Sequence, residues 1–358
     1  MKKHNFSAGP AVLPATVLDQ ASRAVADFND MGLSILEISH RSAEVSAVME
    51  EAVTLVRDLL ELPPQYEVLF LTGGASSQFF MAPMNLLPAG QKAAYIDTGS
   101  WSAKAIKEAK LFGEVEVVAS SKDENYTFIP KDFDLPSDAR YVHITSNNTI
   151  YGTQYQEWPD TGLPFVCDMS SDIFSRPVDA SRFDIIYAGA QKNLGPAGTT
   201  LVIVNTEALG KVDRPIPTML DYRTHIAKNS AFNTPPVYAI YVSMLTLRWI
   251  KAAGGLEAMQ ERAEKKARLI YEEIDINPMF TGTVNREDRS RMNATFVMKK
   301  AYEDRESDFL KACREAGIVG LKGHRSVGGF RASIYNALDV ESVELLVEIM
   351  KNFARKKA

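Results

Sequence analysis

The sequence has 358 residues, of which 46% are hydrophobic and 24% charged, and its formal net charge is −5. This is an ordinary globular composition, and a chain of this length commonly divides into two domains. The mild negative charge provides no basic field for nucleic acid or a membrane surface, so an anionic substrate would need a local cluster of basic groups.

The cysteine content and the N-terminal sequence indicate the compartment. Cys167 and Cys313 lie far apart and form no CxxC pair, which favours a reducing compartment and argues against structural zinc. The first residues lack the apolar stretch of a signal peptide, and no run of about 18 apolar residues could span a bilayer. We therefore expect a cytoplasmic protein with no metal site, no nucleic-acid partner and no membrane contact.

The first hundred residues predict helices alternating with buried strands. Helices are expected over about 14–30 and 45–60, the second preceded by the polar pair His40-Arg41. The apolar run 68–71 is typical of a strand buried on both faces of a parallel sheet. Small residues, 72–78, lead from it into a helix expected from Phe79. Such a loop can aim free backbone N–H groups at a phosphate, although a plain tight turn is the alternative.

Further strands are expected over 93–96, 115–118 and 141–144. Trp101 follows the first of these and precedes a helix that runs to Leu111. Its indole could pack in the core or provide an exposed face on which a planar ring stacks. The strand over 141–144 leads into a loop rich in hydroxyl and amide groups, 146–152.

An acid and a lysine end two later strands. Asp168 closes the apolar strand 163–167, and a carboxylate there needs a cation, a backbone cap or a protonated ring nitrogen. Lys192 follows the strand 185–188 and precedes a Gly/Pro turn, the position where α/β enzymes place their chemistry. Taken alone, Lys192 could be an exposed loop residue, but a desolvated lysine can form a Schiff base. The 24-residue spacing places both on one sheet edge, at the ends of neighbouring or near-neighbouring strands.

After residue 199 the sequence pattern changes from buried parallel strands to a mixture of helices and strands. A strand over 199–204 is expected to return antiparallel, and Asn233 or Thr234 is expected to cap a helix over 237–253. An amphipathic helix over 256–275 leads to an α+β tail with strands at 294–298 and 329–334 and helices at 308–316 and 340–355. This change of pattern places a domain boundary near residue 262. In the tail, a basic glycine-rich loop precedes Arg331, whose place in an apolar strand calls for an anion.

These features together form the set that a pyridoxal 5'-phosphate (PLP) site needs: a lysine, a carboxylate, a stacking ring and a phosphate cradle. The segments that carry a family resemblance are 5–10, 39–41, 72–79, 187–193, 232–236, 322–325 and 331–336. On these segments the chain resembles the phosphoserine aminotransferases, which belong to the fold-type I, class V family of PLP-dependent aminotransferases. The resemblance covers essentially the whole length.

The resemblance implies an α/β fold of the fold-type I PLP-dependent transferases. A large PLP-binding domain, 15–262, would contain a mostly parallel seven-stranded sheet. A smaller α+β C-terminal domain, 263–358 together with the N-terminal segment 1–14, would grip the substrate. The resemblance also implies a homodimer with its active sites at the subunit interface.

The same resemblance implies roles for individual residues. Lys192 would be the Schiff-base lysine, Asp168 would pair with the pyridine nitrogen, Trp101 would stack on the ring, and Thr149 would bond the phenolic oxygen. The cofactor phosphate would be held by Ala75, Ser76, Gln191, and by Asn233 and Thr234 of the partner subunit. Arg331 would bind the substrate α-carboxylate. The second anionic group of the substrate would be held by His324 and Arg325, with His40 and Arg41 of the partner subunit.

The implied reaction transfers an amino group from L-glutamate to 3-phosphohydroxypyruvate, giving O-phospho-L-serine and 2-oxoglutarate in serine biosynthesis. The resemblance also allows 4-phosphohydroxythreonine, a substrate of vitamin B6 (pyridoxine) biosynthesis. The chain departs from some family members at Ser76, where they have arginine, and at Ala8, where they have serine. The alternatives are a cysteine desulfurase-like or small-amino-acid aminotransferase of the same branch, and a catalytically silent protein that binds a phospho-ligand.

Overall fold

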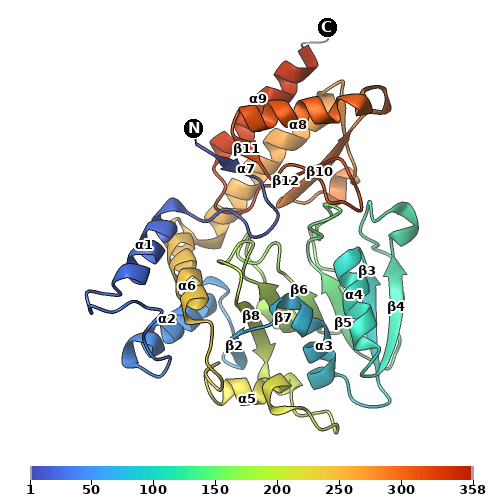
Figure 1. The fold of residues 1–358 in the computed structure, drawn as a ribbon. Helices are drawn as coiled ribbons and strands as arrows, with labels where there is room; N and C mark the ends of the chain where they lie inside the picture. The colour runs from blue at the N-terminus through green and yellow to red at the C-terminus, as the bar shows by residue number, and fades with distance from the viewer. Residues whose placement is uncertain (1, 356–358) are drawn as a thin grey trace.

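The computed structural model describes residues 2–355, which form a larger α/β body and a smaller body stacked on it (Figure 1). The larger body is built around a seven-stranded sheet with the order β2-β8-β7-β6-β5-β3-β4. Its strands are β2 (Tyr66–Leu71), β3 (Lys92–Asp97), β4 (Glu114–Ser120), β5 (Ala139–Thr145), β6 (Phe165–Asp168), β7 (Phe183–Gly189) and β8 (Thr200–Asn205).

The sheet is mostly parallel. Neighbouring strands from β4 to β7 pair in parallel, whereas β8 pairs antiparallel with both β7 and β2. The antiparallel return predicted for 199–204 is therefore confirmed. The parallel environment predicted for 68–71 is wrong, because β2 is an edge strand hydrogen-bonded to β8. A continuous apolar run reports burial on both faces of a sheet and carries no information about the direction of the neighbouring strand.

Both faces of the sheet are covered by helices. These are α1 (Ala15–Ala26), α2 (Ala43–Leu59), α3 (Gly74–Leu86), α4 (Ser100–Ala109), α5 (Tyr222–Ile226) and α6 (Val237–Ala252). Along β2, Phe70 belongs to a cluster with residues of α1, α2 and α6, whereas Leu69 and Leu71 join residues of α3 and α4. This alternation follows from the two-residue period of a strand.

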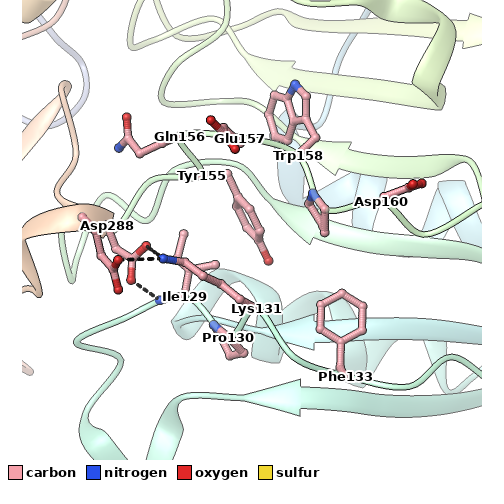
Figure 2. Close-up of a pocket in the computed structure, with 12 residues that line it drawn as sticks. Ile129, Pro130, Lys131, Phe133, Tyr155, Gln156, Glu157, Trp158, Asp160 and Asp288 are labelled. Atoms are coloured by element: carbon pink, nitrogen blue, oxygen red, sulfur yellow. Dashed lines mark hydrogen bonds and ion pairs between the residues drawn. The ribbon is translucent and has the colours of Figure 1, made fainter.

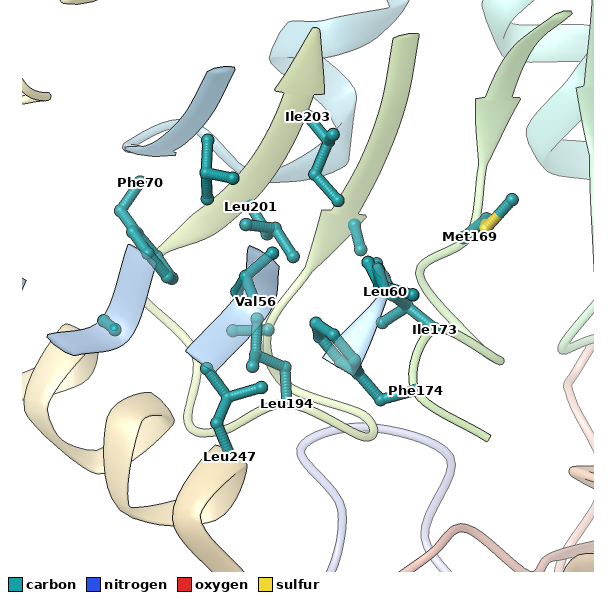
Figure 3. Close-up of a cluster of buried hydrophobic side chains, with 14 of the residues drawn as sticks. Val56, Leu60, Phe70, Met169, Ile173, Phe174, Leu194, Leu201, Ile203 and Leu247 are labelled. Atoms are coloured by element: carbon teal, nitrogen blue, oxygen red, sulfur yellow. The ribbon is translucent and has the colours of Figure 1, made fainter. Parts of the chain in front are cut away.

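The loops that leave β6 and β7 are anchored in the core. Ile173 and Phe174 follow β6, Leu194 follows β7, and all three are buried. Figure 3 shows them packed among side chains from α2, β8 and α6. Residues immediately before these anchors are therefore held in place by close packing.

The smaller body contains helices and short strands. Its helices are α7 (Gly255–Ile276), α8 (Glu306–Glu315) and α9 (Val340–Arg355). Strands β12 (Phe330–Ser333), β10 (Asn293–Met298) and β9 (Phe280–Gly282) form an antiparallel sheet in that order. Strand β1 (His4–Asn5) pairs with β11 (Ile318–Val319) and attaches the N-terminal segment to this body. Short 3-10 helices lie at Lys122–Glu124, Ala180–Arg182, Thr206–Ala208, Thr218–Leu220, Arg286–Asp288 and Lys300–Arg305.

We propose that the two bodies are domains of 15–262 and of 263–355 with the N-terminal segment to residue 14. Helix α7 supports this division, because its first part and its last part join different hydrophobic clusters. Leu256 and Met259 pack in the core of the larger body, whereas Ile270 and Ile274 pack with Phe6 in the smaller one. Within residues 2–355, no helix has both the length and the apolar character needed to cross a bilayer.

The start of α3 and the cap of α6 differ from the sequence predictions, whereas α6 begins at Val237 as expected. Helix α3 begins at Gly74, five residues before the expected start, because the small residues join its first turn. Gly73 has a φ of 98°, and a Cβ there would lie 2.0 Å from Ser77 Oγ, so this turn requires glycine. The cap predicted for α6 is wrong: the N-cap residue is Pro236, with no side-chain cap, and Asn233 and Thr234 are exposed.

Burial of His143 predicts a pH-dependent stability. Its ring stacks on Tyr95 with centroids 4.5 Å apart, Nε2 lies 2.9 Å from Tyr187 Oη, and burial lowers its pKa to about 3 from 6.5. The His143 ring therefore binds a proton more readily in the unfolded chain than in the folded one. Its contribution to the free energy of unfolding is complete above pH 6.5 and is lost as the pH falls toward 3. The expected loss is about 1.4 kcal/mol per pH unit.

Urea unfolding at pH 6.5, 5.5 and 4.5 tests this expectation. His143→Phe keeps the stacked ring but cannot titrate, so its stability should fall less steeply with decreasing pH. Equal slopes for the two proteins would contradict the assignment of a neutral buried histidine.

Candidate active site

The predicted acid and lysine lie at one edge of the sheet. Strands β6 and β7 are hydrogen-bonded neighbours that run in parallel, so their carboxyl ends meet at the same edge, as the spacing predicted. Asp168 is the last residue of β6, and Lys192 follows three residues after β7 ends at Gly189. The loop after β5, which carries Thr149, opens at this edge as well.

The Lys192 amine is held by two hydroxyl groups. Nζ donates to Thr149 Oγ1 at 2.7 Å and to Ser171 Oγ at 2.9 Å, and the two hydroxyl oxygens are 2.7 Å apart. Burial lowers the pKa of Lys192 to about 8; the Asp168 charge raises it and the Arg331 charge lowers it further. A substantial share of the amine is therefore neutral near physiological pH, the form that acts as nucleophile and base.

Asp168 is a buried carboxylate with few partners. Its Oδ1 accepts the backbone N–H of Ser170 at 2.9 Å, and no other described residue hydrogen-bonds to the carboxylate. Burial raises its pKa, while the Lys192 charge and the Ser170 hydrogen bonds lower it. A buried, half-satisfied carboxylate fits a ligand that brings a cationic N–H group.

Trp101 lies in the first turn of α4, close to the loop that carries Thr149. Its ring is half-buried, and its Nε1 is buried without a partner in the described chain. A Cβ on Gly99 would lie 2.2 Å from Asn148 Oδ1, and Asn148 Nδ2 donates to Thr98 Oγ1 at 2.8 Å. Glycine therefore lets the loop after β3, which precedes Trp101, pack directly against the loop after β5, which carries Thr149.

The predicted phosphate cradle is the N-terminus of a helix. Ala75 and Ser76 lie in the first turn of α3, where backbone N–H groups have no intrahelical acceptor. Such groups and the helix dipole favour a bound anion. The side chain of Gln191 lies over Gly189, where a Cβ would be 2.6 Å from Gln191 Oε1, and its main-chain oxygen accepts from Ala11 N at 2.9 Å.

Arg331 brings the smaller body to the same edge. Its Nη1 donates to the main-chain oxygen of Thr149 at 3.3 Å, and its Nε is buried without a partner. Burial lowers the pKa of Arg331, and the pKa of nearby His324 is lowered by burial and by the charges of Arg331, Arg325 and Lys104. An orphaned guanidinium donor within a group of cations fits an anionic ligand.

Four predicted site residues are not joined to the rest within the chain. His40 and Arg41 line a hollow of about 730 Å³ on another part of the larger body, and His40 also borders a hollow with Thr234. Among residues 2–355, no hydrogen bond or ion pair links His40, Arg41, Asn233 or Thr234 to Lys192, Asp168 or Arg331. That these four serve the site of the partner subunit stays a prediction.

Comparison with known proteins identifies the family. The family model described as aminotransferase class-V matches residues 3–346. The chain belongs to this family. A phosphoserine aminotransferase of Flavobacterium johnsoniae is 60% identical over 357 residues, which cover 99% of this chain and 100% of the relative.

Solved structures agree with the family assignment. A phosphoserine aminotransferase from Bacillus circulans subsp. alkalophilus superposes with a TM-score of 0.96 at 49% identity, covering 100% of this chain and 99% of its own. A PLP-bound phosphoserine aminotransferase from Trichomonas vaginalis gives a TM-score of 0.93 at 38% identity, covering 98% of this chain and 100% of its own. The predicted fold class, a fold-type I transferase with a mostly parallel seven-stranded sheet, is confirmed.

Two residues of this class-V site were missed from the sequence. Ser171 follows the strand-ending acid by three residues, and the run of serines there was the available signal. Lys104 lies one helical turn after Trp101, and its Nζ is 4.2 Å from the centre of the indole ring. A contact between the loops after β6 and β7, which sequence spacing does not report, brings Ser171 to Lys192.

A separate cavity of about 460 Å³ lies elsewhere in this aminotransferase. Figure 2 shows that it is lined by Tyr155, Trp158, Lys131 and Asp288 among others. None of the predicted site residues borders it. The acid, lysine and anion-binding groups described above therefore form their own site at the sheet edge.

The electrostatics of Lys192 predict its titration in the cofactor-free chain. The amine should titrate near pH 8 instead of at the ordinary value of 10.5. Asp168→Asn removes a negative charge and should lower the pKa, whereas Arg331→Gln removes a positive charge and should raise it, each by about half a unit. Reductive methylation with ¹³C-formaldehyde, followed by NMR against pH, measures the shift; Lys192→Arg assigns the signal. A titration near 10.5, or shifts in the same direction for both variants, would contradict this electrostatic picture.

Proposed function

We propose that this class-V aminotransferase uses PLP to transfer the amino group of L-glutamate to 3-phosphohydroxypyruvate, giving O-phospho-L-serine and 2-oxoglutarate. One observation carries the proposal: the desolvated Lys192 amine and the half-satisfied Asp168 carboxylate share a sheet edge with the orphaned donor of Arg331. The 60% identical relative from Flavobacterium johnsoniae, a phosphoserine aminotransferase, supports the choice of reaction.

The described residues fit PLP. Asp168 would pair with the protonated ring nitrogen, Lys192 would hold the aldehyde end, and Trp101 would stack on the ring. Thr149 would bond the phenolic oxygen, and the phosphate would take the free N–H groups of the α3 N-terminus and Gln191. When bound, PLP supplies a carbon that accepts the amino group and a ring that withdraws electrons from the substrate Cα.

The protein groups orient the substrate and move its proton. Asp168 stays ionised when a cationic N–H lies against it, because an adjacent opposite charge offsets the cost of burial. The Lys192 amine is held by Thr149 and Ser171, and it would take the proton from the substrate Cα and return it. A pKa of about 8 suits this exchange, because a general base works best when its pKa lies near the operating pH.

The basic groups account for two kinds of anion. Arg331 would bind the α-carboxylate through a two-pronged hydrogen bond. His324 and Arg325, with His40 and Arg41 of the partner subunit, would bind the glutamate side-chain carboxylate in one half-reaction and the phosphate in the other. One set of donors must serve both groups, since the two substrates alternate in a single site.

The buried cysteines disfavour a desulfurase. Cys167 is fully buried in β6, and burial raises its pKa well above the ordinary value. Burial also raises the pKa of Cys313 to about 12. Neither can supply the exposed, reactive thiolate that desulfurase chemistry requires.

The sites of the proposed homodimer would be shared between subunits, since Asn233, Thr234 and Arg41 are exposed in the single chain. The cytoplasmic location expected from the cysteine content stays a prediction.

A substrate panel tests the proposed reaction. The PLP-loaded chain should use 3-phosphohydroxypyruvate with a kcat/KM about 100-fold above that for hydroxypyruvate, because two charge-assisted hydrogen bonds to the phosphate contribute roughly 3 kcal/mol. Arg325→Ala should remove much of this preference, and Lys192→Ala should abolish turnover with every substrate. Equal use of both oxo acids would reject the phosphate assignment. Failure of glutamate to donate its amino group would reject the aminotransferase.

Mixed dimers test the shared site. Lys192→Ala and Arg41→Ala should each be nearly inactive alone. If Arg41 serves the partner's site, each mixed dimer contains one intact site, so random co-assembly should restore about a quarter of wild-type activity. An inactive mixture would show that Arg41 acts within its own subunit, and an active Arg41→Ala protein would show that Arg41 has no role.

A further inference from the structure

We propose that Ser171 is a positioning residue that holds the Lys192 amine beside the reacting centre. This inference rests on the proposed aminotransferase function and assigns a residue that the resemblance did not. Its basis is the triangle formed by Lys192 Nζ, Thr149 Oγ1 and Ser171 Oγ, with sides of 2.7, 2.9 and 2.7 Å.

The hydrogen bonds of the triangle fix the directions of two N–H groups of the Lys192 amine. A lysine ammonium has three N–H donors and no acceptor. Two of them go to Thr149 and Ser171, and the third has no acceptor within the described chain. The amine is therefore held from one side by hydroxyl groups and keeps one N–H position for a ligand.

The two hydroxyl groups differ in what else they must do. In the proposed function, Thr149 also bonds the phenolic oxygen of PLP. Its hydroxyl is also close to Tyr335: burial raises the pKa of that phenol to about 12, and Thr149 offsets a small part of the rise. The Ser171 hydroxyl has no described partner besides Lys192 and Thr149. Ser171 is thus the hydroxyl that stays available to the amine when the cofactor is bound.

The backbone of Ser171 is tied to the lysine loop. Its main-chain oxygen accepts from Asn193 Nδ2 at 3.2 Å, and Asn193 is the residue immediately after Lys192. Asn193 Oδ1 in turn accepts from Asn336 N at 3.0 Å. Because Ser171 and Asn193 are both buried, the serine and the lysine keep a fixed spacing.

Loss of the Ser171 hydroxyl should change the pKa of Lys192 in one direction, downward. The ammonium form would lose one acceptor while the burial that disfavours its charge persists, so the pKa of Lys192 would fall in Ser171→Ala. The side chain would also gain rotational freedom and spend less time against the substrate Cα, so kcat would fall with little change in KM.

The experiment compares three variants of the full-length chain. Ser171→Ala removes the hydroxyl and Ser171→Thr keeps it. Ser175→Ala is the matched control, since this buried serine lies in the same loop and donates only to the Asp172 main-chain oxygen, at 2.6 Å. In the cofactor-free chain, the Lys192 midpoint is read from pH-dependent methylation; in the PLP-loaded chain, the glutamate half-reaction is followed by visible absorption.

For Ser171→Ala we expect a midpoint lowered by roughly half a pH unit or more and a half-reaction rate reduced about 10-fold, with the glutamate concentration for half-saturation changed less than twofold. Ser171→Thr should recover most of both, and Ser175→Ala should match wild type. An unchanged midpoint and rate in Ser171→Ala would overturn the proposal, as would equal losses in Ser175→Ala. The Lys192 midpoint is measured without substrate. A chain that is inactive with glutamate would therefore reject the proposed function but would leave the midpoint test of Ser171 valid.

Discussion

The site depends on the desolvation of one lysine and one carboxylate at the ends of adjacent strands. Burial lowers the pKa of Lys192 and raises that of Asp168, so the buried environment disfavours the charged form of both groups. The charge of each group stabilises the charge of the other. Hydrogen bonds within the chain use only part of the donors of Lys192 and part of the acceptors of Asp168. A ligand with a cationic N–H for the acid and an electrophilic carbon for the amine would complete both, which is what PLP offers.

Such unsatisfied groups can persist only where the surrounding structure holds them. The loop after Asp168 is fastened by Ile173 and Phe174, and the loop after Lys192 by Leu194, all within the main core. Removing any of these side chains would leave a cavity and release a loop that carries a reacting group. Packing in the hydrophobic core therefore fixes the positions of Asp168 and Lys192.

The sequence supported the fold more fully than the site. Strand periodicity and spacing placed Asp168 and Lys192 at one edge, and motif resemblance assigned the family. The antiparallel pairing of β2 and the start of α3 at Gly74 were missed, because an apolar run does not encode its neighbour and small residues suit both loops and helix starts. Ser171 was missed because its role arises from a contact between two loops, with Lys192 21 residues further along the chain. Lys104 was missed although it lies only one helical turn after Trp101.

Arg331 connects the two bodies electrostatically as well as through Thr149. Its positive charge contributes to the low pKa of Lys192, and its Nε lacks a partner. In the proposed reaction, a substrate carboxylate bound there would satisfy that donor and offset the positive charge. The pKa of Lys192 would then rise when substrate arrives, since a nearby positive charge no longer disfavours the ammonium. The residue that recognises the amino acid would thereby make the amine a stronger base when a Cα proton is present to be taken.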